Sequence, residues 1–188
     1  MLESHLIATA NQKVLRLLAK FPDQEFYERE VVRKLGISAG SANRALNELY
    51  STGAITRRRE GKMYFYSIDT SNSALVEFKK TVNLLLIELL VEELKGISSR
   101  IILYGSCALG TDDSESDLDL FIVSSRRKRA SNLISSFTFP RGLENIHIQA
   151  VIKTPVELLK QGESERAFIE EVERGVVLWE RSVGESRV

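Results

Sequence analysis

Residues 101–123 read IILYGSCALGTDDSESDLDLFIV, which is two apolar runs joined by a glycine-containing turn and an acidic loop. Asp117 and Asp119 stand at the start of the second apolar run, a predicted strand. Because strand side chains alternate between faces, both carboxylates are expected to point to the same side. Two like charges this close need a neutralising partner. Mg²⁺, which binds one or two carboxylates together with phosphate oxygens, is the natural candidate.

The glycines and serines of this stretch add the other half of the expected site. Gly105 allows the backbone to approach a ligand closely, and amides with the Ser106 hydroxyl at a following helix start can hold a phosphate. An Asp-x-Asp pair alone is more often part of a solvated hairpin. The combined spacing G-S-x-x-x-G-x-x-x-x-x-S-D-x-D between two strands is much more specific.

This spacing resembles the signature of the DNA polymerase beta-like nucleotidyltransferase superfamily, in its small, minimal branch, over about residues 98–181. The resemblance implies Mg²⁺-dependent transfer of a nucleoside monophosphate from a nucleoside triphosphate to a hydroxyl of a protein or small molecule. It implies Asp117 and Asp119 as catalytic residues and metal ligands. The nucleotide-binding residues that it implies are Gly105, Ser106, Gly110 and Ser116.

The third predicted strand, residues 145–152, departs from the family pattern. In active members a third carboxylate projects from this strand toward the paired aspartates, whereas His147 and Gln149 are the polar residues here, and Glu144 lies just before the strand. His147 can act as a base near neutrality, but Gln149 cannot accept a proton. Since general-base catalysis typically contributes about 10²–10⁴-fold, catalysis should be slow while nucleotide and metal binding survive.

The N-terminal part predicts three helices and a hairpin. Apolar periodicity indicates helices over residues 3–21, 27–35 and 39–51, with Ser38 at an N-cap and Gly36 and Gly53 as stops. The third helix should bury Ala42, Leu46, Leu49 and Tyr50. Residues 56–68 form two strand-like runs around Glu60-Gly61, which predicts a β-hairpin.

Residues 8–70 resemble a winged helix-turn-helix domain, in which the third helix enters the DNA major groove and the hairpin contacts the backbone. Its outward polar and basic residues suit phosphates and base edges of double-stranded DNA. The candidate DNA-binding residues are Ser38, Ser41, Asn43, Arg44, Arg57, Arg58, Arg59 and Lys62. The alternative is that these are solvated charges and that the module mediates protein contacts or dimerisation.

Composition bounds the remaining possibilities. No apolar run approaches the roughly 20 residues that span a bilayer, and no signal peptide is evident, so we expect a cytoplasmic protein with no membrane partner. The single cysteine, Cys107, allows no intrachain disulfide, and with His5 and His147 it cannot make the usual zinc site. Residues 1–70 carry a net charge of +3 and residues 71–188 a net charge of −3, which suggests two modules.

The expected domains are therefore residues 1–70 and 71–188, with a boundary near Ser71. A helix over residues 72–95 is apolar nearly all round, so it is buried or contacts a second copy in a homodimer. The basic run Ser124–Arg129 is expected to be solvated, with triphosphate or nucleic-acid contact as the second possibility. Further helices are predicted over residues 130–136, 155–161 and 164–173, a strand or turn over 175–180, and disorder over 182–188.

The expected fold class is α+β: a winged helix-turn-helix of three helices and a hairpin wing, followed by a small nucleotidyltransferase fold with a mixed sheet and flanking helices. Three functions remain open. The chain is a DNA-binding nucleotidyltransferase, a transcriptional regulator whose transferase-like domain senses a nucleotide without turning it over, or an interaction protein such as the antitoxin partner of a toxin.

Overall fold

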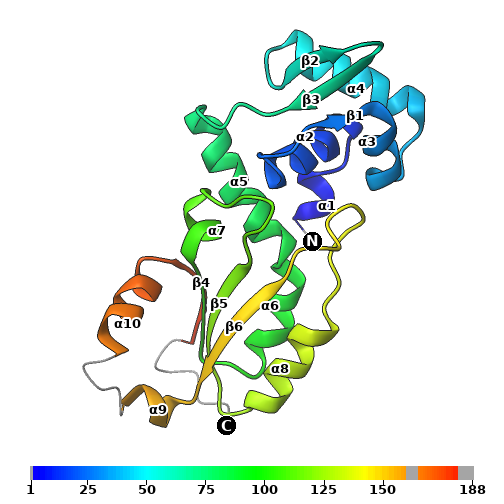
Figure 1. The fold of residues 1–188 in the computed structure, drawn as a ribbon. Coiled ribbons are helices and arrows are strands. Elements are labelled where there is room, and N and C mark those ends of the chain that lie inside the picture. Colours follow the sequence, from blue (N-terminus) through cyan, green and yellow to red (C-terminus); the bar gives the residue numbers. More distant parts are fainter. Residues whose placement is uncertain (1, 160–164, 182–188) are drawn as a thin grey trace.

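The computed structural model describes residues 2–159 and 165–181, and it has the expected α+β architecture. A helical part with a small antiparallel sheet lies at one end, and a four-stranded mixed sheet with flanking helices lies at the other (Figure 1). Helix α5 runs from the first part into the second. The segments 160–164 and 182–188, which include parts of two predicted helices and the predicted disordered end, lie outside the described residues.

The N-terminal part contains the three predicted helices and the hairpin wing. Its elements are α1 (Glu3–Leu6), α2 (Ala10–Lys20), β1 (Phe26–Tyr27), α3 (Glu28–Leu35), α4 (Ala39–Ser51), β2 (Thr56–Glu60) and β3 (Met63–Ser67). The Ser38 side chain caps α4 by accepting from the Ser41 amide, and Gly36 ends α3 in the left-handed conformation, as the sequence predicts. The wing is completed by β1, which pairs with β3.

Two details of this part correct the sequence-based expectation. Residues 3–21 form two helices, because Thr9 and Gln12 make a capping box that starts α2 afresh. Tyr50 does not join the core but remains 40% exposed on α4, where its ring packs against the guanidinium of Arg57.

The second sheet has the strand order β6-β5-β4-β7 and is mixed. Strand β5 pairs antiparallel with β4 and parallel with β6, and β7 pairs antiparallel with β4. The elements of this part are α5 (Ser73–Leu86), α6 (Glu88–Lys95), β4 (Arg100–Tyr104), α7 (Gly105–Leu109), β5 (Leu118–Val123), α8 (Arg127–Ser136), β6 (Ile148–Lys153), α9 (Pro155–Leu159), α10 (Arg166–Glu173) and β7 (Val176–Glu180).

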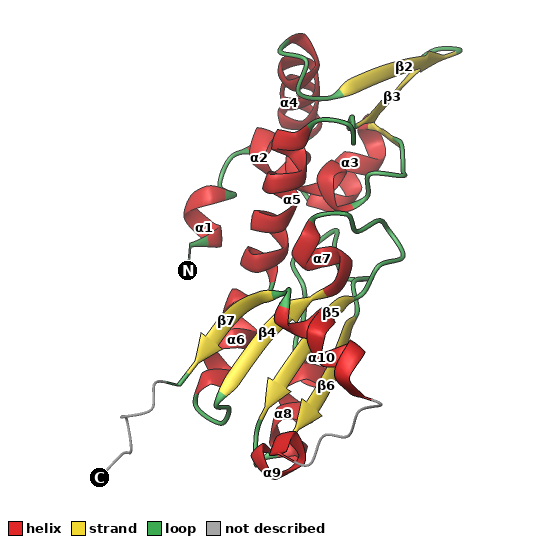
Figure 2. Cartoon of the chain, turned by 90° about the vertical axis from the view of Figure 1, so that its left-hand side faces the viewer, coloured by secondary structure: helices red, strands yellow, loops and turns green. Residues whose placement is uncertain are grey.

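The two faces of this sheet are covered by different helices. Helices α6 and α8 lie on one face and α10 on the other (Figures 1 and 2). Alternation along β5 follows this division: Leu118, Leu120 and Ile122 join the larger core, whereas Phe121 and Val123 join the smaller core under α10. Asp119 therefore shares its face with Phe121 and faces the α10 side.

Three further boundaries differ from the prediction. The apolar stretch 72–95 is two helices, α5 and α6, which break at Ile87; an unbroken apolar pattern gives no signal for such a break. Strand β6 begins at Ile148 rather than residue 145, and α8 begins within the basic run, whose arginines and lysine are exposed. The predicted segment 175–180 is the edge strand β7.

One hydrophobic core continues through both halves of the chain. It joins Leu17 and Leu46 of the N-terminal part to Val82 of α5 and to Leu103 and Leu120 of the larger sheet. The domain boundary near Ser71 stays a prediction. Among the described residues, none of the helices combines the length and apolar character needed to cross a membrane.

Candidate functional site

The start of α7 brings Gly105 directly against the carboxylate of Asp119. Gly105 has a φ of +70°, and a Cβ atom built on it would lie 2.6 Å from Oδ2 of Asp119. A side chain here would therefore suffer both an unfavourable backbone conformation and a collision. Tyr104 and Asp119 are direct partners across β4 and β5, which explains how two segments 14 residues apart meet at this point.

Asp117 and Asp119 form the acidic pair that the sequence predicts, and both are half-buried. Burial raises the pKa of Asp119, and the neighbouring charges of Asp117 and Glu171 raise it further. No salt bridge from Lys, Arg or His reaches either carboxylate within residues 2–159 and 165–181. Among these residues, no positively charged side chain offsets the repulsion between the two carboxylates. A bound cation is therefore favoured as their partner.

The pair provides two carboxylate ligands. In the part of the chain that the structure describes, no group of three or more His, Cys, Asp or Glu side chains is arranged to hold a metal ion. Two carboxylates nevertheless fit Mg²⁺, because this ion keeps several waters and takes its remaining ligands from substrate phosphates.

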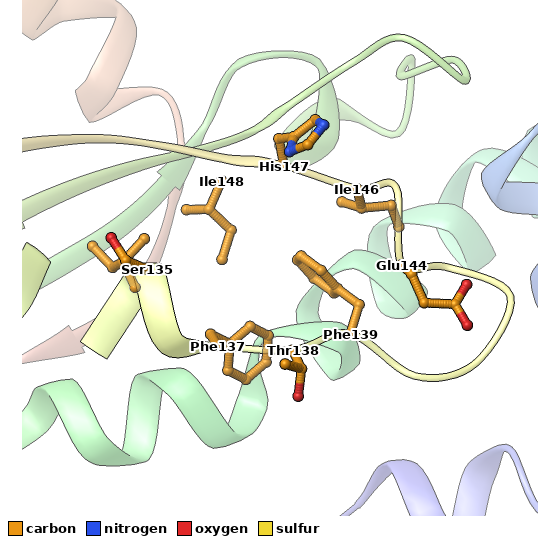
Figure 3. Close-up of a pocket in the computed structure, with 9 residues that line it drawn as sticks. Ser135, Phe137, Thr138, Phe139, Glu144, Ile146, His147 and Ile148 are labelled. Carbon is orange, nitrogen blue, oxygen red and sulfur yellow. The ribbon is translucent and has the colours of Figure 1, made fainter. Parts of the chain in front are cut away.

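Gln149 lies beside Asp119, where the sequence predicts a possible third residue of the site. It is the direct neighbour of Asp119 in the parallel pairing of β5 with β6, so both side chains lie on the same face. His147 precedes β6 and lines a separate cavity of about 400 Å³ with Phe137, Phe139 and Glu144 (Figure 3). No residue of that lining, as described, is Asp117 or Asp119. The geometry therefore favours Gln149 over His147 as the occupant of the third position.

Glu171 of α10 is an acidic residue near the site that the sequence did not single out. Its charge raises the pKa of both Asp119 and Tyr104, after the larger effect of burial. With Gly105 and Arg174 it lines a cavity of about 450 Å³ between α7 and α10. Its position depends on how α10 packs on the sheet, where the Phe168 ring contacts those of Tyr104 and Phe121, and the local sequence carries no sign of this.

The other motif residues shape the loop around the pair. Ser116 accepts a hydrogen bond from the Asp113 amide and donates one to the Asp113 carboxylate, so it orders the loop. Gly110 ends α7 with a φ of +71°, and a Cβ there would lie 2.5 Å from the Val76 carbonyl of α5. Ser106 is half-buried beside Gly105. Nucleotide contact by Gly105, Ser106, Gly110 and Ser116 stays a prediction.

A sequence model of the nucleotidyltransferase domain family matches residues 86–181, which is about half of the chain. The chain belongs to the nucleotidyltransferase domain family. The match contains Gly105, Asp117 and Asp119, so the paired carboxylates lie within the family's domain. No curated protein sequence matches the chain.

Three solved structures are similar to part of the chain. Reduced HlyU from Vibrio cholerae N16961 is 22% identical, with 45% of this chain and 81% of that chain covered and a TM-score of 0.34. Rv0081 of M. tuberculosis is 20% identical over 50% and 93%, with a TM-score of 0.35. PyrSV_gp04 from Pyrobaculum spherical virus is 21% identical over 48% and 55%, with a TM-score of 0.30. Similarities with TM-scores this low do not indicate what the chain binds.

The candidate DNA-binding residues on α4 are partly engaged in local contacts. Ser38 and Ser41 bond to one another at the start of the helix, and the Asn43 amide donates to Glu28. Arg44 is exposed and contributes to no side-chain ion pair within the described ranges. Asn43 and Lys62 also line a cavity of about 600 Å³ between α3, α4 and the wing.

The three wing arginines do not share one face. Arg57 stacks on the rings of Tyr50 and Tyr64, on the side of the hairpin that faces α4, and Arg59 lies near Tyr64. Arg58 points to the opposite face, because strand side chains alternate, and it pairs with Glu25 and Glu60. The structure thus separates Arg58 from the other two, and the period-two alternation of the sequence already contained that signal.

Proposed function

We propose that this nucleotidyltransferase-family protein binds a nucleoside triphosphate with Mg²⁺ at Asp117 and Asp119 and transfers the nucleoside monophosphate to a hydroxyl acceptor. The observation that carries the proposal is the acidic pair itself: two half-buried carboxylates, unpaired among the described residues, with one of them against Gly105. Without a cation, repulsion between the two carboxylates lowers the stability of the fold. Such an arrangement is typical of a site that binds a cation.

The roles of the chain's own residues follow from their positions. Asp117 and Asp119 would hold the metal ion, and Gly105 leaves room for phosphate oxygens beside them because it has no side chain. The Ser106 hydroxyl is available to donate to a phosphate oxygen. A Mg²⁺ ion held by these two carboxylates would supply positive charge to offset the negative charge that develops on the phosphate oxygens. The bond from the acceptor oxygen to the α-phosphorus would form as the bond from the α-phosphorus to pyrophosphate breaks, and the hydroxyl proton would pass to solvent.

A second candidate function is supported by Gln149. An amide stands beside Asp119 where active relatives are expected to carry a carboxylate, so no base is in place at that position. A protein that binds the nucleotide and turns it over slowly or not at all would act as a nucleotide sensor. The N-terminal part would then regulate transcription by binding double-stranded DNA through α4 and the wing.

Binding and turnover can be separated in one experiment. Each of ATP, GTP, CTP and UTP is titrated into the protein by calorimetry with and without Mg²⁺, and the same samples are assayed for pyrophosphate. Metal-dependent binding with pyrophosphate release supports the transferase. Metal-dependent binding without release supports the sensor.

The control variants locate the binding site. Asp117→Asn/Asp119→Asn should abolish the metal-dependent binding, because it removes both negative charges that would attract Mg²⁺. Glu115→Gln removes one negative charge from the exposed part of the same loop and should leave binding unchanged. Unchanged binding in the double variant would contradict the assignment of the binding site to Asp117 and Asp119.

A further inference from the structure

The acidic loop that follows α7 is anchored on the N-terminal part by a buried lysine. Lys20, the last residue of α2, is 2% exposed, and its ammonium group lies 2.8 Å from Oδ2 of Asp112. It also lies 3.2 Å from Oδ1 of Asn83 and 3.6 Å from the Cys107 sulfur. The cluster therefore joins α2, α5, α7 and the acidic loop inside the molecule.

The charges of this cluster do not balance as a simple ion pair. Lys79 of α5 is also buried, lies 3.6 Å from Oδ1 of Asp112 and donates to the Asp112 carbonyl. One lysine would suffice to neutralise Asp112, and burying a second cation has a desolvation cost. A need to neutralise Asp112 therefore does not account for the presence of both lysines.

Lys20 is linked to the candidate catalytic aspartate through Cys107. The Asn83 amide, which also contacts Lys20 and Asp112, donates to the Cys107 carbonyl at 2.9 Å. The Cys107 thiol donates to the carbonyl of Asp117 at 3.2 Å. The backbone at Asp117 is thus hydrogen-bonded to Cys107, which itself contacts Lys20.

A second contact from the N-terminal part holds the outer side of the same loop. The carboxylate of Asp23, three residues after Lys20, accepts hydrogen bonds from the amide and the hydroxyl of Ser114. The loop therefore contacts Lys20 on its buried side and Asp23 on its outer side. Lys20 is the last residue of α2 and Asp23 lies in the turn that follows, and both lie outside the segment that matches the nucleotidyltransferase family.

We propose that Lys20 is a positioning residue for the nucleotide site, which the N-terminal part thereby helps to build. Lys20 orders residues 110–117 and, through Cys107, the backbone at Asp117, so that the two carboxylates face the metal-bound triphosphate together. This inference rests on the proposed nucleotide binding for its functional consequence, but the ordering of the loop can be measured without any nucleotide.

The test uses the full chain with Lys20→Met and a matched control. Arg16→Met removes a buried cation one turn earlier on the same helix, where Arg16 pairs with Glu3 away from the loop. Hydrogen exchange is followed in peptides covering residues 105–119 and, for comparison, the wing. Each variant is also titrated with ATP, GTP, CTP and UTP in Mg²⁺. If Lys20→Met does not fold, Ser114→Ala supplies a milder loss of the loop's anchoring on the N-terminal part, because it removes the hydroxyl that donates to Asp23.

Lys20→Met should speed exchange in residues 110–119 about tenfold or more, as expected for the loss of hydrogen bonds to a charged group. Nucleotide affinity should fall by a similar factor, and Ser114→Ala should give a smaller change of the same kind. Arg16→Met should not single out this loop. Exchange that rises equally over the whole chain, or no more in the loop than in Arg16→Met, would overturn the proposal. Absence of nucleotide binding by the wild type would instead count against the proposed function, and the exchange measurement would still decide the role of Lys20.

Discussion

Asp112 lies in the acidic loop and Asp119 in strand β5, which follows it, and the two carboxylates have opposite surroundings. Asp112 is 1% exposed and is contacted by Lys20, Lys79 and Asn83. Asp119 is half-buried, lies near two other carboxylates and has no cationic partner in the described part of the chain. A carboxylate that is paired with cationic side chains of the protein stabilises the fold. A carboxylate that lies near other carboxylates without a cationic partner indicates a site for a bound cation.

The largest expected effect comes from removing the compensated charge. Asp112→Asn leaves Lys20 and Lys79 buried without a counter-charge, which should lower the free energy of unfolding by about 3–5 kcal/mol. Urea denaturation of the two proteins measures this difference. A loss below about 1 kcal/mol would mean that Asp112 is not the structural carboxylate.

Gly105→Ala tests the close approach beside Asp119. The methyl group would collide with the carboxylate and force a left-handed residue, so we expect a loss of about 1–3 kcal/mol in stability and the loss of Mg²⁺-dependent nucleotide binding. Gly61→Ala is the matched control, because Gly61 also has a positive φ, +57°, but has no atom within 4 Å of its Cβ position. Retained nucleotide binding in Gly105→Ala would contradict the close approach.

Asp119→Asn should stabilise the metal-free protein at neutral pH, in contrast to Asp112→Asn. Because the folded-state pKa of Asp119 is raised, ionisation of this group opposes folding. We therefore expect the Tm of the metal-free variant to lie above that of the wild type at neutral pH.

The pH dependence of this gain has a definite sign. The folded protein holds the Asp119 proton more tightly than the unfolded chain, so wild-type stability falls as pH rises from the unfolded pKa of about 4 through the raised folded value. The advantage of Asp119→Asn should therefore disappear below about pH 4 in thermal melts of the metal-free proteins. A variant that melts below the wild type at pH 7 would show that Asp119 is compensated internally.

The same contrast between paired and unpaired charges separates the arginines of the N-terminal part, with the smallest expected effect. Arg44 is exposed without an ion pair among the described residues, whereas Arg58 is held by Glu25 and Glu60. If α4 and the wing bind double-stranded DNA, Arg44→Ala should reduce the slope of log affinity against log salt by about 0.9, the value for one phosphate contact. Arg58→Ala should leave the slope unchanged in the same fluorescence titration, and equal effects of the two variants would contradict this assignment.

Local signals in the sequence were sufficient for much of this fold. Apolar periodicity and caps predict α3 and α4 closely, and the spacing around Gly105 and Asp119 predicts the strand-helix-strand unit that carries the acidic pair. The restart of α2 at Thr9 also had a local signal, the capping pair of Thr9 with Gln12, which the helical periodicity of residues 3–21 obscured.

Long-range packing explains what the sequence could not predict. Lys20 reads as a solvated residue in the last turn of a helix, and only the docking of α2 on the loop 92 residues away reveals its burial. Glu171 approaches Asp119 only because α10 returns over the sheet. The alternation that places Gln149 beside Asp119 was visible in the sequence, but the register of β6 against β5 depends on the folded sheet.

The most direct test of the central claim is a titration of Mn²⁺, a spectroscopically visible substitute for Mg²⁺, into the protein with ATP, GTP, CTP or UTP, with free Mn²⁺ followed by its paramagnetic resonance signal. The wild type and Glu115→Gln should deplete free Mn²⁺ beyond what the nucleotide alone binds, and Asp117→Asn/Asp119→Asn should not. Equal depletion by all three proteins would contradict a metal-nucleotide site at the acidic pair.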